Sequence, residues 1–89
     1  MTKIFDILSY EEMLVLGFLV RNCKEAGFIA TTYTHIHNSI PVSLEKVKAA
    51  IKKMADIKYL RIIEDERANL ILKIHSQILY KYQKHTQDN

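Results

Sequence analysis

The stretch TYTHIHNSIPVSLEKVKAAIKKMADIKYL, residues 32–60, contains the pattern that decides the fold. Its second half predicts an amphipathic helix over residues 43–57, because apolar residues recur there every three or four positions. Ser43 is a good N-cap for this helix. A shorter helix, expected over residues 33–39 with Thr31 or Thr32 as its cap, ends before the chain's only proline. Two helices joined by a tight turn therefore form the centre of the predicted structure.

The longer of these helices divides its residues between two faces, at about 100° of rotation per residue. The apolar face, expected to be buried, carries Leu44, Val47, Ala50, Ile51, Met54 and Ile57. The opposite face, expected to be exposed, carries Glu45, Lys46, Lys48, Ala49, Lys52, Lys53 and Asp56. One side of the helix is thus a core stripe, and the other is mostly cationic.

The rest of the chain adds elements on both sides of this centre. Ser9 and Glu12 form an S-x-x-E capping box, which predicts the start of a first helix. Residues 28–30 indicate a short strand, residues 59–64 and 70–74 a hairpin with a polar turn, and residues 74–86 a C-terminal helix. We expect a mainly α fold with a small β-hairpin in one domain over residues 1–89: an N-terminal arm (1–8), a core (9–73) and the C-terminal helix.

The order helix, short strand, helix, turn, helix, hairpin, helix resembles the winged helix-turn-helix superfamily. The motif residues are Ile36, Ile40, Val42 and Ser43, followed by apolar Val47, Ile51 and Met54. The stretch 8–62 is similar to the N-terminal domains of phage and plasmid replication-initiation proteins, and MarR-type regulators are a close second. The resemblance implies a DNA-binding transcriptional regulator or replication-associated factor. The small size and lone domain suggest a viral or plasmid protein rather than a cellular one. Lys58 stands where such domains commonly have Gly.

Charge is concentrated on the predicted recognition helix. The whole chain has a net charge of +3, whereas residues 43–61 hold six basic residues against two acidic ones, a local +4. Such a cluster is an electrostatic footprint for a polyanion, so the expected partner is double-stranded DNA with helix 43–57 in its major groove. Phosphates would be contacted by Lys46, Lys48, Lys52 and Lys53, with Arg61 and Arg67 adding to the DNA-binding set; bases would be contacted by Ser43, Glu45 and Ala49.

The hairpin turn favours a different class of function. Glu64, Asp65 and Glu66 make it acidic, with only Arg67 to offset them. Phosphates would repel such a tip, so we do not expect the hairpin to lie along the DNA backbone. The alternative is a winged-helix module that binds another protein through its acidic wing and does not bind DNA.

The C-terminal helix allows two interpretations. Its apolar residues could contact a second copy in a homodimer, which would place two recognition helices about 34 Å apart over a palindromic site. They could equally fold back onto the chain's own core. The expected dimer residues are Ile74, Ile78, Leu79 and Tyr82.

Several other functions are not expected. His35, His37 and Cys23 form an incomplete zinc motif, because residues two apart on a helix do not share a face. No glycine-rich phosphate loop and no nucleophile with a base is evident, so we expect neither an enzyme nor a cofactor. The longest apolar run, residues 13–20, is too short to span a bilayer, and a cytoplasmic location is expected.

Overall fold

The helices begin at the polar residues that the sequence singles out. The computed structural model describes residues 3–67 and 69–87. Helix α1 (Tyr10–Asn22) has both hydrogen bonds of the capping box: the Glu12 N–H donates to Ser9 Oγ, and the Ser9 N–H donates to the Glu12 carboxylate. Thr32 caps α2 (Tyr33–Ser39) and Ser43 caps α3 (Leu44–Asp56), each by accepting from the backbone N–H three residues later. The last helix, α4, spans Ser76–Gln87.

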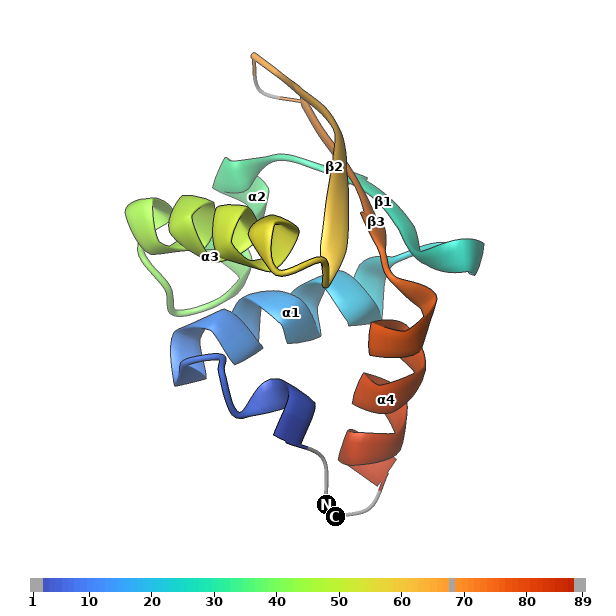
Figure 1. Cartoon of the computed structure of the whole chain (residues 1–89). Coiled ribbons are helices and arrows are strands. Elements are labelled where there is room, and N and C mark those ends of the chain that lie inside the picture. Colours follow the sequence, from blue (N-terminus) through green and yellow to red (C-terminus); the bar gives the residue numbers. More distant parts are fainter. Residues whose placement is uncertain (1–2, 68, 88–89) are drawn as a thin grey trace.

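A three-stranded antiparallel sheet accompanies these helices. Its strands are β1 (Phe28–Thr31), β2 (Leu60–Glu66) and β3 (Asn69–Ile74), in the order β1-β3-β2. The expected hairpin is therefore present, and the short strand joins its other side by pairing with β3. The β2–β3 ladder shifts register between Ile62 and Glu64. Figure 1 shows the hairpin extending well beyond the helices at the top of the view.

The core lies between the helices and one face of the sheet. Helix α1 is buried along Val15–Leu19, as its apolar composition predicts, and lies next to α3 and α4 (Figure 1). The buried apolar side chains are those of Phe5, Leu8, Val15, Leu16, Phe18, Leu19, Ile29, Ile36, Val42, Val47, Ala50, Ile51, Met54, Tyr59, Leu60, Leu70, Leu72, Ile74 and Ile78. The molecule is thus mainly helical with a small sheet. No helix within 3–67 and 69–87 has the length and apolar character needed to cross a bilayer.

Both ends of the described chain contribute to this core. Residues 1–8 were expected to form an arm, but the side chains of Phe5 and Leu8 are buried, and the Phe5 ring packs edge-on against Tyr59 and Tyr82. A short 3-10 helix at Lys3–Phe5 brings this segment to α4. The segment packs inward because its apolar residues cover surface that α1 and α4 leave open.

Two backbone positions have a positive φ that matters to the fold. Gly27, in a 3-10 turn (Glu25–Gly27) before β1, has φ +85°, and a Cβ there would lie 2.7 Å from the Ile74 carbonyl oxygen. Only glycine fits such an approach. Lys58, between α3 and β2, has φ 69°. Lys58 therefore adopts a left-handed backbone conformation that is sterically unfavourable for a residue with a Cβ and favourable for glycine.

Candidate nucleic-acid interface

Helix α3 has one buried side and one exposed side, as its sequence predicts. Val47, Ala50, Ile51 and Met54 are buried in the core. The side chains of Glu45, Lys46, Lys48, Ala49, Lys52 and Asp56 are exposed, and Lys53 is half-buried. An α-helix with its side chains is about 10–12 Å across, and the major groove of DNA is about 12 Å wide. The exposed side of α3 is therefore of a size that a groove can admit.

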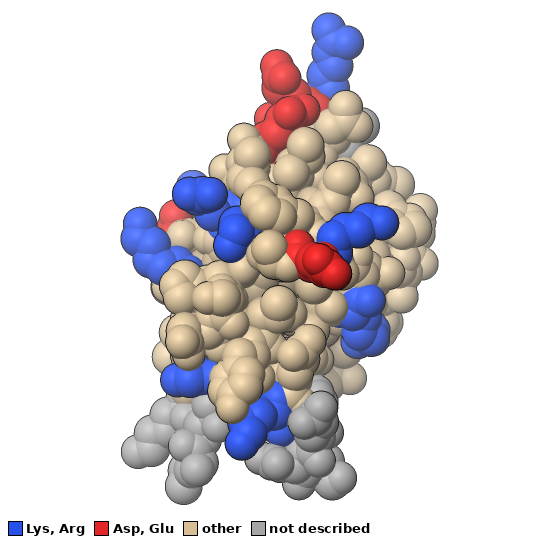
Figure 2. All heavy atoms as spheres, turned by 90° about the vertical axis from the view of Figure 1, so that its right-hand side faces the viewer, with Lys and Arg blue, Asp and Glu red and all other residues tan. Residues whose placement is uncertain are grey.

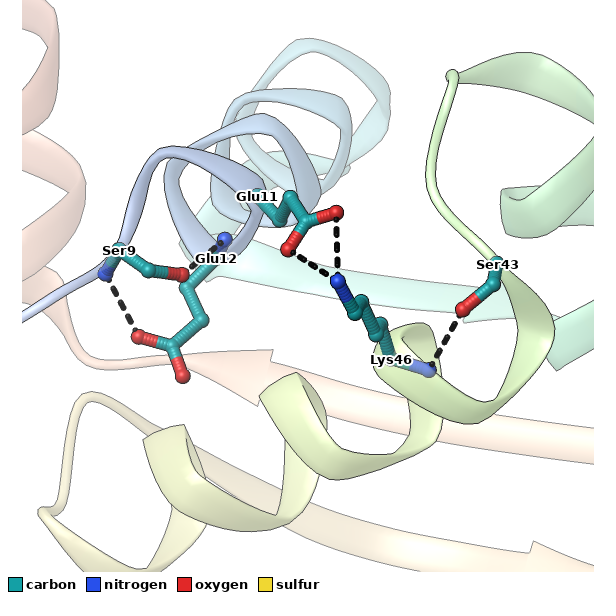
Figure 3. Close-up of polar contacts among 5 residues, drawn as sticks. All are labelled: Ser9, Glu11, Glu12, Ser43 and Lys46. Atoms are coloured by element: carbon teal, nitrogen blue, oxygen red, sulfur yellow. Dashed lines mark hydrogen bonds and ion pairs between the residues drawn. The ribbon is translucent and has the colours of Figure 1, made fainter.

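Lys46 does not extend freely from this exposed side. Its Nζ lies 3.0 Å from Oε1 and 3.2 Å from Oε2 of Glu11, on α1. Figure 3 shows the Lys46 side chain reaching from α3 toward that carboxylate. The two side chains are 61% and 39% exposed, so water screens the ion pair and its contribution to stability is small. Lys46 therefore neutralises an acidic residue of its own chain.

Lys53 makes two hydrogen bonds, one to α1 and one to the segment that precedes it. Its Nζ donates to Glu12 Oε1 at 2.9 Å and to the Ile7 carbonyl oxygen at 2.7 Å. Burial acts to raise the pKa of the Glu12 carboxyl, but the hydrogen bond from the Ser9 N–H and the Lys53 ammonium together hold that pKa below its ordinary value. Glu12 thus caps α1 and binds α3 at the same time.

These two ion pairs involve half of the four α3 lysines that were expected to contact DNA phosphates. Lys46 and Lys53 lie on the flank of α3 that faces α1, and their ammonium groups already have carboxylate partners. Lys48 and Lys52 are exposed, and among the residues described neither has a carboxylate within 4 Å. The cations of α3 that remain available to a polyanion are therefore Lys48 and Lys52.

Lys48 shares a hollow with a basic residue from the hairpin. This hollow, of about 200 Å³, is lined by Thr32, Tyr33, Thr34, Leu44, Lys48 and Arg67. The Lys48 Nζ lies 5.7 Å from the centre of the Tyr33 ring, at the range of a cation–π contact. Lys48 and Arg67, two residues of the predicted DNA-binding set that are 19 positions apart in sequence, therefore line the same hollow. The hydroxyl-bearing side chains at the start of α2 line it as well.

Tyr33 also holds the hairpin in place. Its hydroxyl donates a hydrogen bond of 2.8 Å to Asp65 Oδ2. Burial, together with the hydrogen bond to Asp65 and its negative charge, raises the pKa of the Tyr33 hydroxyl to about 12. The phenol remains a neutral donor at physiological pH and ties the hairpin to the start of α2. One of the three acidic groups of the hairpin is thereby engaged within the chain.

The remaining charge of the hairpin tip is acidic, as expected. Figure 2 shows acidic side chains gathered at the tip, at the top of the view, with a basic side chain beyond them. Glu66 and Arg67 are exposed, and Glu64 is half-buried. The tip therefore presents both signs of charge, and its basic residue is the one that lines the hollow with Lys48.

Arg61 lies elsewhere. It is exposed on β2 directly opposite Lys73 of β3, and it lines a second hollow with Lys58, Lys73 and His75. The structure thus does not bring Arg61 into the hollow of Lys48 and Arg67. Sequence reasoning missed Lys73 and His75, because their proximity to Arg61 depends on strand register, which no local pattern in the chain discloses.

The side chains considered for zinc have separate neighbours. The His35 ring packs edge-on against Phe18, His37 Nδ1 lies 2.8 Å from the Val42 carbonyl oxygen, and the Cys23 thiol donates to the Val20 carbonyl oxygen. Within the described part of the chain, no three His, Cys, Asp or Glu side chains are placed to share a metal ion. His37 instead links α2 to the turn before α3.

The residues expected at a dimer interface are largely used within the chain. Ile74 and Ile78 are buried in the core, which leaves their side chains no surface for a second copy. Leu79 and Tyr82 are half-buried and pack against that core. The phenol of Tyr82 lies over Gly17, where a Cβ would meet its oxygen at 2.6 Å. Ile74 ends β3, whereas it was expected to begin the C-terminal helix, and its side chain is a core residue of the sheet. The other three residues fit the interpretation in which α4 folds back onto its own core.

The chain was compared with family models, with curated proteins and with solved structures. No significant match was found. A function is therefore argued below from the geometry and charge of the chain itself.

Proposed function

We propose that the protein is a winged helix-turn-helix domain that binds double-stranded DNA with α3 in the major groove. The observation that carries this proposal is the meeting of Lys48 from α3 and Arg67 from the hairpin at one hollow beside the exposed side of α3. Neither cation has a carboxylate within 4 Å among the described residues. Uncompensated cations on a groove-sized helix and on the hairpin beside it favour a phosphate backbone.

The contacts divide into positioning and reading. Lys48, Lys52 and Arg67 contact phosphates, which supply affinity and register but no sequence information. Glu45 and Ala49 are exposed on the same helix and contact base edges, where Glu45 accepts from a cytosine amino group and Ala49 touches a thymine methyl. Ser43 takes a smaller part than the sequence implies, because its oxygen already accepts from the Lys46 N–H. Its hydroxyl proton remains available to a base or phosphate.

Salt dependence tests this proposal most directly. Each phosphate contact contributes about −0.9 to the slope of log K against log salt concentration, so three contacts give a slope near −3. The double variant Lys48→Ala, Lys52→Ala should reduce the magnitude of that slope by about two. Fluorescence anisotropy with a generic duplex, titrated at several salt concentrations, measures the slope.

A matched control separates local contacts from overall charge. The double variant Lys81→Ala, Lys84→Ala also removes two positive charges, from exposed positions on α4. We expect this control to retain the slope of the unmodified protein. Equal slopes for all three proteins, or no salt-sensitive binding by the unmodified protein, would exclude α3 as the DNA-binding element.

The acidic hairpin favours a second candidate, a module that binds a basic surface of another protein. Glu64 and Glu66 lie near the tip, and no ion pair involving them is formed among the described residues. Charge reversal, Glu64→Lys with Glu66→Lys, distinguishes the candidates. The reversal should strengthen duplex binding if α3 and the hairpin face DNA, because it removes repulsion from phosphates. The absence of duplex binding both before and after the reversal would favour the protein-binding candidate.

The proposal includes a homodimer, in keeping with the two-fold symmetry of DNA half-sites. The four residues first considered, Ile74 of β3 and Ile78, Leu79 and Tyr82 of α4, are buried in the chain's own core or packed against it. Tyr80 on α4 is instead 57% exposed. Equilibrium sedimentation of the unmodified protein and of Tyr80→Ser tests whether a second copy contacts α4. A monomer at high protein concentration would remove the dimer from the proposal.

A further inference from the structure

A basic hollow lies beside β2, apart from the hollow of Lys48 and Arg67. We call it the β2 hollow; it is lined by Ala55, Lys58, Leu60, Arg61, Ile62, Lys73 and His75. Its volume is about 510 Å³, within the range of about 300–1,000 Å³ that is common for small-molecule sites. The lining holds three cations and one histidine, and it contains no acidic residue.

Two of these cations oppose one another across the sheet. Arg61 on β2 and Lys73 on β3 are directly paired in the antiparallel register. Like charges at directly opposed positions destabilise a sheet. Among the described residues, no carboxylate lies within 4 Å of either cation. The Lys73 Nζ lies 5.5 Å from the centre of the Phe28 ring, on β1. The register thus brings two positively charged residues to one pair of the ladder, and an anion bound between them would offset their mutual repulsion.

The third cation occupies an unfavourable backbone conformation. Lys58 has φ 69°, in the left-handed region where a residue with a side chain costs about 1–2 kcal/mol relative to the right-handed region. Glycine would adopt the same conformation freely. The Lys58 N–H donates to the Ala55 carbonyl oxygen at the end of α3, which fixes the turn. Lys58 therefore carries its charge at a position where a side chain lowers local stability.

His75 adds a donor to the same hollow. Its Nδ1 accepts a hydrogen bond of 3.1 Å from the Gln77 N–H. The neutral ring therefore carries its proton on Nε2, which can donate to an anion. The backbone N–H of His75, just after β3, donates to the carbonyl oxygen of Tyr59, just before β2, and this bond holds His75 at the edge of the hollow.

We propose that the β2 hollow binds an organic phosphate, namely a phosphate monoester joined to a flat apolar ring of the size of a mononucleotide. Arg61, Lys58 and Lys73 bind the phosphate group. Three cations complement the two negative charges of a phosphate monoester better than they complement the single charge of a carboxylate. Ala55 and Ile62 supply an apolar wall for the ring. This site does not depend on DNA binding by α3, because it shares no residue with the hollow of Lys48 and Arg67.

The proposal predicts an unusual combination of effects in the variants Lys58→Gly and Arg61→Gln. Lys58→Gly relieves the left-handed lysine, and Arg61→Gln removes the repulsion from Lys73, so both variants should have a melting temperature equal to or above that of the unmodified protein. Both should bind the phosphate compound about tenfold or more weakly, the factor expected for the loss of one charge-assisted hydrogen bond. A fold defect cannot produce weaker binding together with greater stability.

Two-dimensional amide NMR of the ¹⁵N-labelled full chain measures this binding, with adenosine 5′-monophosphate as the probe. Adenosine, inorganic phosphate and a short duplex are added in parallel, and Lys81→Gln serves as a control outside the hollow. Saturable shifts at the lining amides with the monophosphate, weaker with inorganic phosphate and absent with adenosine, are the expected result. No saturable shift up to about 10 mM monophosphate, or shifts with the duplex alone, would overturn the proposal.

Discussion

The contact between Glu12 and Lys53 is expected to couple the start of α1 to α3 in a measurable way. Two unit charges about 4 Å apart attract by about 1 kcal/mol in bulk water and by about 4 kcal/mol at an effective dielectric constant of 20. The Lys53 and Glu12 side chains are 41% and 19% exposed, which places the pair nearer to the aqueous value. After screening by water and loss of side-chain entropy, we expect a coupling of about 0.5–1 kcal/mol.

A double-mutant cycle isolates this coupling. Glu12→Gln keeps a side-chain oxygen for the Ser9 N–H, whereas Lys53→Met keeps the length of the side chain without its charge. Urea unfolding of the two single variants and the double variant, followed by circular dichroism, gives the coupling free energy at pH 7. The same cycle at Glu11 and Lys46 is the control. That pair is more exposed, at 39% and 61%, and should couple by less than about 0.5 kcal/mol.

The pH dependence of the cycle provides a second check. The pKa of Glu12 is lowered in the folded chain, so the charged form is favoured by folding. The stability that it contributes is present above the unfolded pKa, about 4.3, and is lost as the pH falls through the lower folded value. A coupling of zero at pH 7, or one that persists unchanged at about pH 2, would refute the reasoning.

Three further predictions concern the backbone, the hairpin and the core. Gly27→Ala should lower the free energy of unfolding by about 2 kcal/mol or more in urea titrations, because φ is positive and the added Cβ would meet the Ile74 carbonyl oxygen. A loss under about 0.5 kcal/mol would contradict the assigned conformation. Ultraviolet titration should show a phenol that ionises near pH 12, and Asp65→Asn should lower its pKa, which assigns it to Tyr33 rather than to Tyr59, whose pKa burial also raises. Because the folded pKa of Tyr33 is raised, the associated stability is present below about pH 10 and lost as the pH rises through about 12. Ile51→Ala should destabilise the chain by about 2–5 kcal/mol in the same unfolding assay, since the side chain is fully buried, and a loss below 1 kcal/mol would place it outside the core.

Local patterns were sufficient to predict the elements of the fold. Ser9 with Glu12, and Ser43 alone, mark helix starts because the hydroxyl oxygen satisfies a backbone N–H a few residues later. Both predicted caps have the corresponding hydrogen bonds in the structure. The amphipathic period of α3 likewise separated its buried residues from its exposed ones. These features depend on neighbours within four residues, which is why the sequence discloses them.

The candidate site was only partly predictable, because its geometry depends on distant segments. Rotation about the helix axis placed Lys46 and Lys53 on the polar side of α3, but it could not show that α1 would flank that side with Glu11 and Glu12. The capping box predicts the place of Glu12 at the start of α1 but not its contact with α3. Similarly, Arg61 lies opposite Lys73 because of the register between β2 and β3, which is a non-local property.

The register shift between Ile62 and Glu64 affects whether separate molecules can associate through the edge of the sheet. The order β1-β3-β2 leaves one side of β2 without a neighbouring strand, and a straight strand edge of that kind can recruit the same strand from another chain. The shift interrupts the even spacing of backbone groups along that edge, and the charged side chains of Arg61 and Asp65 flank it. The irregularity thus protects concentrated protein against intermolecular β-aggregation, although it leaves Ile63 exposed to water.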